Sequence, residues 1–370
     1  MTDLFTPFTL GSLKLPNRIV MAPMTRAFSP GGVPGADVAA YYRRRAEGGV
    51  GLIITEGTWI PEPHASNDPR VPRFYGDDAL AGWKTVLQEV KAAGGHIIPQ
   101  LWHVGTAPKP DVSDLYGENG KSQAEIGPSG VLSADETVGE PMTLKQIEDA
   151  AQAYVDAAAT AWKMGFDGVE LHGAHGYLID QFFWHVTNRR TDDYGGNLSE
   201  RTRFAADIVR GIRAATAPDF PIVLRFSQWK IVDYGAKLAT TPEELGAFLA
   251  PLVDAGVDIF HASQRRFWEP EFAGSDLNLA GWTKRITGRP VITVGSVSLD
   301  TDTLESMVNN SKGAASTGLR DLPERLARDE FDLVAVGRAL IANPDWPRQI
   351  RDGQIAGLRR FDTSHLTELV

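Results

Sequence analysis

Eight short apolar runs, separated by longer segments of helical periodicity, constrain the fold of this chain more than any other feature. They are continuous runs rather than alternating ones, which is typical of strands buried on both faces of a parallel sheet. Eight consecutive β-α units predict a single (β/α)8 barrel, because the rival arrangement, a doubly wound open sheet, rarely reaches eight regular units. The runs are RIVMAP (18–23), VGLIITE (50–56), HIIPQLW (96–102), DGVELH (167–172), PIVLRFS (221–227), DIFHAS (258–263), PVITVG (290–295) and DLVAVG (332–337).

Helix boundary signals lie between these runs. Thr143 is a candidate N-cap for a helix that ends at Gly165, Ser199 is a candidate cap for the next helix, and Pro242 falls in the first turn of another. The first 17 residues contain the turn pair Gly11-Ser12, so we expect a hairpin that plugs the N-terminal end of the barrel.

Three connections are long for a compact barrel: residues 103–142 after the third strand, 173–198 after the fourth, and 308–330 between the seventh and eighth. Long connections of this kind are usually functional loops or local caps. The chain contains no internal repeat, low-complexity tract or linker, which predicts one domain over residues 1–370.

Charge and composition exclude several classes of protein. The net charge is −10, so there is no surplus of Lys and Arg to neutralise a nucleic acid or an anionic membrane. We see no signal peptide and no apolar run of 18 residues, and we expect a cytoplasmic protein. Cysteine is absent, which excludes disulfides, iron–sulfur clusters and cysteine-type zinc sites.

In a barrel of this kind the chemistry lies at the C-terminal ends of the strands. These ends offer no lysine suited to a Schiff base, no carboxylate pair and no phosphate-binding loop or dinucleotide fingerprint. The polar and glycine residues at the ends are Thr25 and Arg26; Glu56 and Gly57; Gln100 and His103; His172, His175 and Tyr177; Arg225 and Ser227; His261 and Ser263; Gly295 and Ser296; and Gly337 and Arg338.

This set suits a flat, phosphorylated heterocycle. Gly295-Ser296 and Gly337-Arg338 follow strands seven and eight, the usual phosphate position of this barrel, where glycines admit backbone N–H groups and arginine adds a charge-assisted grip. Gln100 offers a donor and an acceptor together, and Arg225 offers permanent positive charge. Flavin mononucleotide (FMN) meets these requirements, although Gln100 could also be an ordinary polar strand end and Arg338 a salt-bridge residue.

His172, His175 and Tyr177 place three hydrogen-bonding rings within six positions. Taken alone, the two histidines could be a metal pair or satisfied loop residues. A metal needs a third ligand and none is placed for it, so we predict no metal site. Trp102 is either a wall of the pocket or plain core, and we interpret His103, His185 and His261 as structural.

The stretch HGAHGYLIDQFFWHVTNRRTDDYGGNLSERTRF carries the most specific pattern, H-x-x-H-x-Y followed by N-x-R-T-D-x-Y-G-G. With LFTPFTLGSLKLPNRIVMAPMTR near the start and VGRALIANPDW near the end, the chain resembles the Old Yellow Enzyme family of FMN-dependent ene-reductases over nearly its whole length. Thr25 stands where one branch of that family has Cys, so the chain resembles the classical branch.

The resemblance implies a barrel enzyme with non-covalent FMN and with NADPH or NADH as hydride donor. It also implies ping-pong transfer of hydride through flavin N5 to the activated C=C bond of an enone. The residues implied to hold FMN are Pro23, Met24, Thr25, Gly57, Gln100, Arg225, Gly295, Ser296, Gly337 and Arg338.

The resemblance further implies that His172 and His175 bind the substrate carbonyl and that Tyr177 donates the proton. Trp102 and Thr25 complete the implied substrate site, and Trp229, Phe267 and Trp268 are candidates for its outer wall. Two alternatives stay open at the same flavin site: a barrel dehydrogenase, and a reductase of nitro compounds or nitrate esters. We expect small-molecule partners only and a monomer or homodimer.

Overall fold

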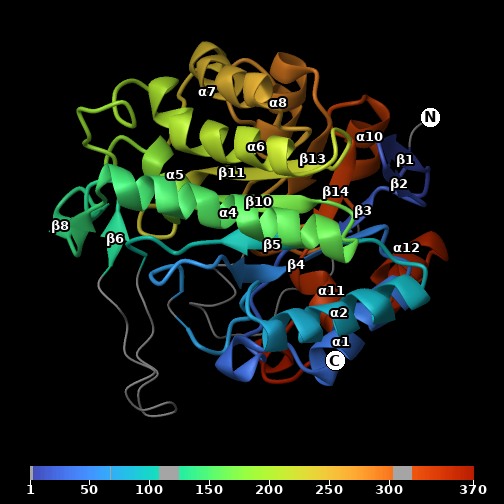
Figure 1. Cartoon of the computed structure of the whole chain (residues 1–370). Helices are drawn as coiled ribbons and strands as arrows, with labels where there is room; N and C mark the ends of the chain where they lie inside the picture. Colours follow the sequence, from blue (N-terminus) through green and yellow to red (C-terminus); the bar gives the residue numbers. More distant parts are fainter. Residues whose placement is uncertain (1–2, 67, 108–124, 303–318) are drawn as a thin grey trace.

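The computed structural model describes residues 3–66, 68–107, 125–302 and 319–370. Within these ranges eight parallel strands close into a barrel, and each begins in one of the eight predicted runs, which confirms the (β/α)8 prediction (Figure 1). Several strands continue beyond the predicted run at their C-terminal ends, so the residues expected just after a strand lie within it. In barrel order the strands are β3 (Ile19–Met21), β4 (Leu52–Trp59), β5 (Ile97–Trp102), β10 (Val169–His175), β11 (Ile222–Lys230), β12 (Ile259–Ser263), β13 (Val291–Val294) and β14 (Leu333–Val336).

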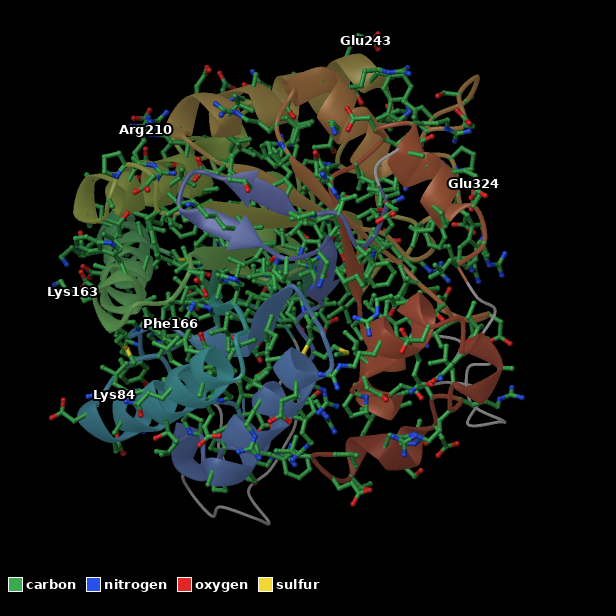
Figure 2. The ribbon with its side chains drawn as sticks, turned by 90° about the vertical axis from the view of Figure 1, so that its right-hand side faces the viewer. Lys84, Lys163, Phe166, Arg210, Glu243 and Glu324 are labelled. Carbon is green, nitrogen blue, oxygen red and sulfur yellow. The ribbon has the colours of Figure 1, made fainter. Side chains whose placement is uncertain are left out.

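Helices surround this barrel, with their charged side chains on the periphery of the molecule (Figure 2). The labelled charged residues in that view, such as Lys84, Arg210 and Glu324, come from different helices of the ring. The main helices are α1 (Ala36–Glu47), α2 (Asp77–Ala92), α4 (Leu144–Met164), α6 (Arg203–Ala215), α7 (Pro242–Ala255), α8 (Leu279–Thr287), α10 (Leu322–Ala327), α11 (Arg338–Ala342) and α12 (Trp346–Arg351). None of the helices in the described ranges has both the length and the apolar character needed to cross a lipid bilayer.

The helix boundaries follow from local hydrogen bonding. Thr143 forms a capping box with Gln146, and Gly165 ends α4 in the left-handed conformation that glycine adopts without strain. Pro242 lies in the first turn of α7, as the sequence predicts, and Thr241 caps that helix. The prediction for Ser199 is wrong: its side chain makes no capping hydrogen bond, and a 3-10 turn, η3 (Glu200–Thr202), precedes α6.

The N-terminal hairpin closes one end of the barrel. Strands β1 (Phe8–Leu10) and β2 (Leu13–Leu15) pair antiparallel on either side of the Gly11-Ser12 turn. Phe8, Leu13 and Leu15 pack in one apolar cluster with residues of the barrel interior, including Val20 and Leu52. Because these contacts fill the N-terminal end with side chains, the opposite end is left for a site.

The three long connections differ in content. In the first connection, residues 108–124 lie outside the described ranges. The residues that follow form the short strands β6 (Ile126–Gly127), β7 (Val131–Ser133), β8 (Glu136–Thr137) and β9 (Glu140–Pro141). The second holds α5 (Leu178–Phe183), and Arg190 within it donates to the carbonyl oxygens of Pro128 and Met142, joining the two connections. Of the third, residues 308–318 lie outside the described ranges and the remainder contains α10.

Candidate active site

A cavity of about 460 Å³ lies at the C-terminal ends of the barrel strands, within the range of small-molecule sites. Every residue implied to hold FMN, to bind the substrate carbonyl or to donate the proton lines it, although those residues are spread from position 23 to position 338. They are Pro23, Met24, Thr25, Gly57, Gln100, Trp102, His172, His175, Tyr177, Arg225, Gly295, Ser296, Gly337 and Arg338.

Three glycines lie in the cavity wall, and at two of them a side chain would not fit. A Cβ added to Gly57 would lie 2.6 Å from the Trp102 ring, at an irregularity in the pairing of β4 with β5. Gly295 has φ +144°, and an added Cβ would lie 2.8 Å from the Gln264 carbonyl oxygen. Gly337 has more room, with Met24 Sδ 3.5 Å from the added atom. Glycine at positions 57 and 295 is therefore required by the close packing of Trp102 and of the segment after β12, and all three glycines lie in the cavity lining.

Arg225 brings an unsatisfied positive charge to the cavity. Its side chain is buried on β11, one Nη donates to Ser263 Oγ at 3.2 Å, and its Nε has no partner in the described part of the chain. Burial lowers the pKa of Arg225, and the charge of Glu170 opposes this shift. A buried guanidinium N–H without an acceptor indicates a missing ligand atom, as FMN would supply.

Arg338 begins α11 directly after β14. Its guanidinium donates to the carbonyl oxygens of Thr301 at 2.6 Å and Asp302 at 2.9 Å, and it lies over the Phe361 ring at 5.8 Å. These contacts hold the guanidinium beside Gly295 and Ser296 in the cavity lining, where glycine backbone and positive charge suit a phosphate.

His172, His175 and Tyr177 form one cluster of rings in the cavity wall. The His172 ring lies 5.1 Å from that of His175 and 4.8 Å from that of Tyr177, and Trp102 meets the edge of Tyr177 at 4.9 Å between ring centroids. Burial, followed by the charge of Arg225, lowers the pKa of both histidines well below its usual value. Both imidazoles are therefore neutral at pH 7. Burial raises the pKa of Tyr177 to about 12, so the phenol keeps its proton.

A buried ion pair braces the turn that carries these rings. Lys230 Nζ lies 2.7 Å from Asp180 Oδ1, both side chains are fully buried, and Asp180 Oδ2 accepts the Gly176 N–H at 2.7 Å. His175 has φ +67°, which is strained for a side chain of this size, and its backbone N–H donates to Ser227 Oγ. The turn is therefore held from the neighbouring strand β11, where Lys230 pairs with His175 in register.

Sequence reasoning assigned no role to two carboxylates that support the site: it did not name Glu170, and it named Glu56 only as a strand-end residue. Glu170, fully buried, accepts from the Gln100 amide at 2.7 Å and lies 2.6 Å from His261 Nδ1. Glu56 accepts the backbone N–H groups of Arg26 and Ala27 at 2.9 and 3.0 Å, which fixes the loop after Thr25, and burial raises the pKa of Glu56 to about 7. Alternation along β10 places Glu170 on the same side as His172, a signal that was available in the sequence.

The outer wall is only partly as expected. Trp229 lines the cavity and stacks on His175 at 4.4 Å, and Tyr234 stacks on Trp229 at 5.3 Å between centroids. Phe267 is fully buried in the core, and Trp268 packs beneath Arg320, so neither lines the cavity and that prediction is wrong for both. The C-terminal residues Phe361, Thr363 and Leu366 form a further part of the lining that sequence reasoning missed.

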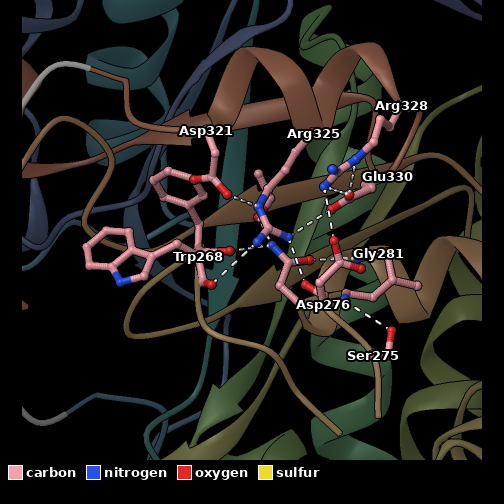
Figure 3. Close-up of polar contacts among 12 residues, drawn as sticks. Trp268, Ser275, Asp276, Gly281, Asp321, Arg325, Arg328 and Glu330 are labelled. Carbon is pink, nitrogen blue, oxygen red and sulfur yellow. Dashed lines mark hydrogen bonds and ion pairs between the residues drawn. The ribbon is translucent and has the colours of Figure 1, made fainter. Parts of the chain in front are cut away.

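The segment after β12 is held in place by α10. Arg325 donates to the carbonyl oxygens of Asp276 at 2.9 Å and Trp268 at 3.5 Å, and it pairs with Asp321 at 2.6 Å and Glu330 at 3.0 Å (Figure 3). This network joins residues 263–278 to α10. The described residues of the connection before β14, 319–330, therefore have a structural role.

The comparisons with known proteins agree with this geometry. The family model described as NADH:flavin oxidoreductase / NADH oxidase family matches residues 3–322. An NADH oxidase of Thermoanaerobacter brockii is 34% identical over 97% of this chain, which spans only 52% of that protein. Morphinone reductase in complex with tetrahydroNAD superposes with a TM-score of 0.78 at 30% identity, covering 99% of this chain and 94% of the other. For the Old Yellow Enzyme from Pichia sp. AKU4542 the TM-score is 0.77 at 27% identity, with 99% and 90% covered.

The protein belongs to the Old Yellow Enzyme family. It is therefore a flavin oxidoreductase, with FMN and a nicotinamide dinucleotide as its cofactors. The cavity of this family member fits FMN in two respects. Arg225 Nε is buried without a partner in the described part of the chain, and Gly295, Ser296, Gly337 and Arg338 meet in the lining at the ends of β13 and β14. The described residues include no group of three or more His, Asp or Glu side chains placed to hold a metal ion.

Proposed function

We propose that this flavin oxidoreductase reduces the activated C=C bond of α,β-unsaturated carbonyl compounds at the expense of NAD(P)H. The observation that carries the proposal is the cluster of two neutral imidazoles and one protonated phenol in one wall of the cavity. When bound, FMN supplies the carrier that takes hydride from NAD(P)H and gives it to the alkene. The chain's own residues must then polarise the substrate, orient it and supply a proton.

The two histidines polarise the substrate. An alkene conjugated to a carbonyl accepts hydride at Cβ only if negative charge can develop on the carbonyl oxygen. Neither His172 Nε2 nor His175 Nδ1 has a hydrogen-bond partner among the described residues, and both side chains line the cavity. Two N–H donors directed at one oxygen would stabilise that charge in the transition state.

Tyr177 supplies the proton to Cα. Its ring lies between Trp102 and His172, so the phenol is held beside the position of the carbonyl. A phenol with a pKa of about 12 is fully protonated at neutral pH and is still a stronger acid than the carbon it protonates. Hydride at Cβ and this proton at Cα together complete the saturated product.

FMN would be held through its phosphate by Arg338 and by the backbone at Gly295 and Ser296. Arg338→Ala should weaken FMN binding about 10- to 150-fold, because a charge-assisted hydrogen bond contributes about 1.5–3 kcal/mol. Fluorescence titration of the FMN-free protein with FMN measures this. Arg351→Ala, an exposed arginine on α12, gives the matched loss of charge and should bind as the parent does. Equal affinity of Arg338→Ala and the parent would disprove the phosphate assignment.

Phenolates resemble the polarised substrate oxygen, so they should bind to the two histidines and give a long-wavelength charge-transfer band with the flavin. The variant His172→Ala/His175→Ala should lose at least about 100-fold in phenolate affinity, since two hydrogen bonds to a charged oxygen are removed. His185→Ala, an exposed histidine of the same connection, serves as control. A double variant that retains FMN and titrates with phenol as the parent does would remove the histidines from this role.

A further inference from the structure

We infer that Ser263, at the end of β12, is a positioning residue that holds His175 in the tautomer with its proton on Nδ1. This inference rests on the proposed function, because it concerns the ring that would bind the substrate oxygen. A neutral imidazole donates from only one nitrogen, so a histidine that must donate to a ligand needs its other nitrogen to accept a hydrogen bond. The local geometry supplies a different hydrogen-bond donor to one ring nitrogen of each of the two histidines.

For His172 the backbone decides the tautomer. Its Nδ1 accepts the N–H of Ala174 at 3.4 Å, and a backbone amide can only donate. The proton of the neutral ring must therefore be on Nε2. That nitrogen has no partner among the described residues, and the His172 side chain lines the cavity.

For His175 the tautomer depends on the Ser263 hydroxyl, which can donate or accept a hydrogen bond. His175 Nε2 lies 2.7 Å from Ser263 Oγ, and Arg225 Nη2 donates to the same oxygen at 3.2 Å. Ser263 is buried, and within the described ranges its hydroxyl has no partner besides these two. Since arginine can only donate, the serine proton has one acceptor available, which is His175 Nε2.

Assigning the proton the other way would leave a buried donor unsatisfied. If His175 carried its proton on Nε2, the Ser263 oxygen would accept twice and its own O–H would have no acceptor among the described residues. Such a buried, unpaired group is costly, whereas the first assignment satisfies Ser263, Arg225 Nη2 and the ring together. The proton of His175 is then on Nδ1, and the pair offers His172 Nε2 and His175 Nδ1 as its two donors.

Trp229 and Ser227 complete the placement of the His175 ring without deciding its tautomer. Trp229 stacks on the ring face at 4.4 Å and donates its indole N–H to the Ser263 carbonyl oxygen at 3.1 Å. Ser227 accepts the backbone N–H of His175 at 2.9 Å. Ser263 is therefore the one described side chain that is hydrogen-bonded to a ring nitrogen of His175.

The direct test is ¹⁵N NMR of the holoenzyme labelled at histidine, with His175 assigned from the signals lost in His175→Asn. Protonated and unprotonated ring nitrogens of a neutral imidazole have widely separated shifts and distinct couplings to the ring protons. The parent should show His175 protonated on Nδ1, and a proton on Nε2 would overturn the inference. This readout needs neither substrate nor turnover, so it is independent of whether enones are the substrate.

Substitution gives the second test. Ser263→Ala should move the His175 proton to Nε2 and weaken phenolate binding about 10- to 100-fold, the loss of one donor to a charged oxygen. Ser263→Thr keeps the hydroxyl, so its His175 tautomer and its phenolate affinity should be those of the parent. Ser227→Ala disturbs the same turn and should leave the His175 tautomer unchanged. Retention of the Nδ1 proton in Ser263→Ala would contradict the inference. Failure of the parent to bind phenolates, with the Nδ1 tautomer present, would instead contradict the proposed function.

Discussion

Tyr177→Phe should slow the reduction of an enone by about 10²–10⁴-fold, the usual contribution of a positioned general acid, and leave reduction of the enzyme by NAD(P)H close to the parent rate. The substitution keeps the ring contacts with Trp102 and His172 and removes only the acidic O–H. The NAD(P)H half-reaction needs no proton from this phenol, so the two half-reactions should separate. Anaerobic stopped-flow traces of each half-reaction, with cyclohexenone as the oxidant, measure the difference.

A nitroalkene is the internal control for this variant. Addition of hydride to a nitroalkene gives a stable nitronate that can take its proton from solution, so Tyr177→Phe should slow this oxidant far less than the enone. In the parent, the enone step should show no loss from tyrosine ionisation up to about pH 11, because the pKa of Tyr177 is about 12 and only the protonated form donates. Equal slowing of both half-reactions would indicate a general structural defect, and an unchanged enone rate would mean that another group donates the proton.

Lys230→Met should lower the free energy of unfolding by about 3–5 kcal/mol, because it leaves the carboxylate of Asp180 buried without its partner. Urea unfolding at saturating FMN measures this loss. Burial already raises the pKa of Asp180 to about 6 with Lys230 present. A carboxyl whose pKa is higher in the folded than in the unfolded state stabilises the fold only while protonated. The loss in Lys230→Met should therefore be smaller at pH 5 than at pH 8.

Two further variants separate this effect from a general loss of lysine. Lys237→Met removes a half-exposed lysine that pairs with Glu271, and it should cost less than about 1 kcal/mol. Adding Asp180→Asn to Lys230→Met removes the unpaired charge and keeps an oxygen toward the Gly176 N–H, so it should recover part of the loss. If Lys230→Met were as stable as Lys237→Met, the buried pair would not brace the turn.

The barrel was predictable because each strand lies in a continuous apolar run and several helices, such as α4 and α7, carry their own boundary signals. The exceptions are local. Ser199 is of a residue type that often caps helices, but its side chain makes no capping hydrogen bond and the 3-10 turn η3 precedes α6. The cavity lining was equally predictable, because parallel strands of a barrel bring their C-terminal ends together whatever lies between them in sequence. The order of Gly57, Gln100, His172 and Arg225 along the chain therefore became their order around one cavity.

What sequence reasoning missed depends on contacts between segments far apart in the chain. Glu170 looks like part of an apolar run until the barrel places it between Gln100 and His261. Phe267, in the segment after β12, and Trp229, near the end of β11, are both aromatic, yet only Trp229 reaches the cavity. Leu366 lines the cavity because the C-terminal segment returns to the barrel mouth, a path that no local pattern encodes.

The central claim is that the His172–His175–Tyr177 wall makes this flavin oxidoreductase a reductase of enones. It is tested most directly by mixing the NAD(P)H-reduced holoenzyme with cyclohexenone in the absence of oxygen and following flavin absorbance. The account predicts rapid, saturable recovery of the oxidised spectrum with one equivalent of cyclohexanone formed, and a recovery slowed at least about 100-fold in His172→Ala/His175→Ala. A flavin that stays reduced with the enone, or that recovers equally fast in the double variant, would contradict it.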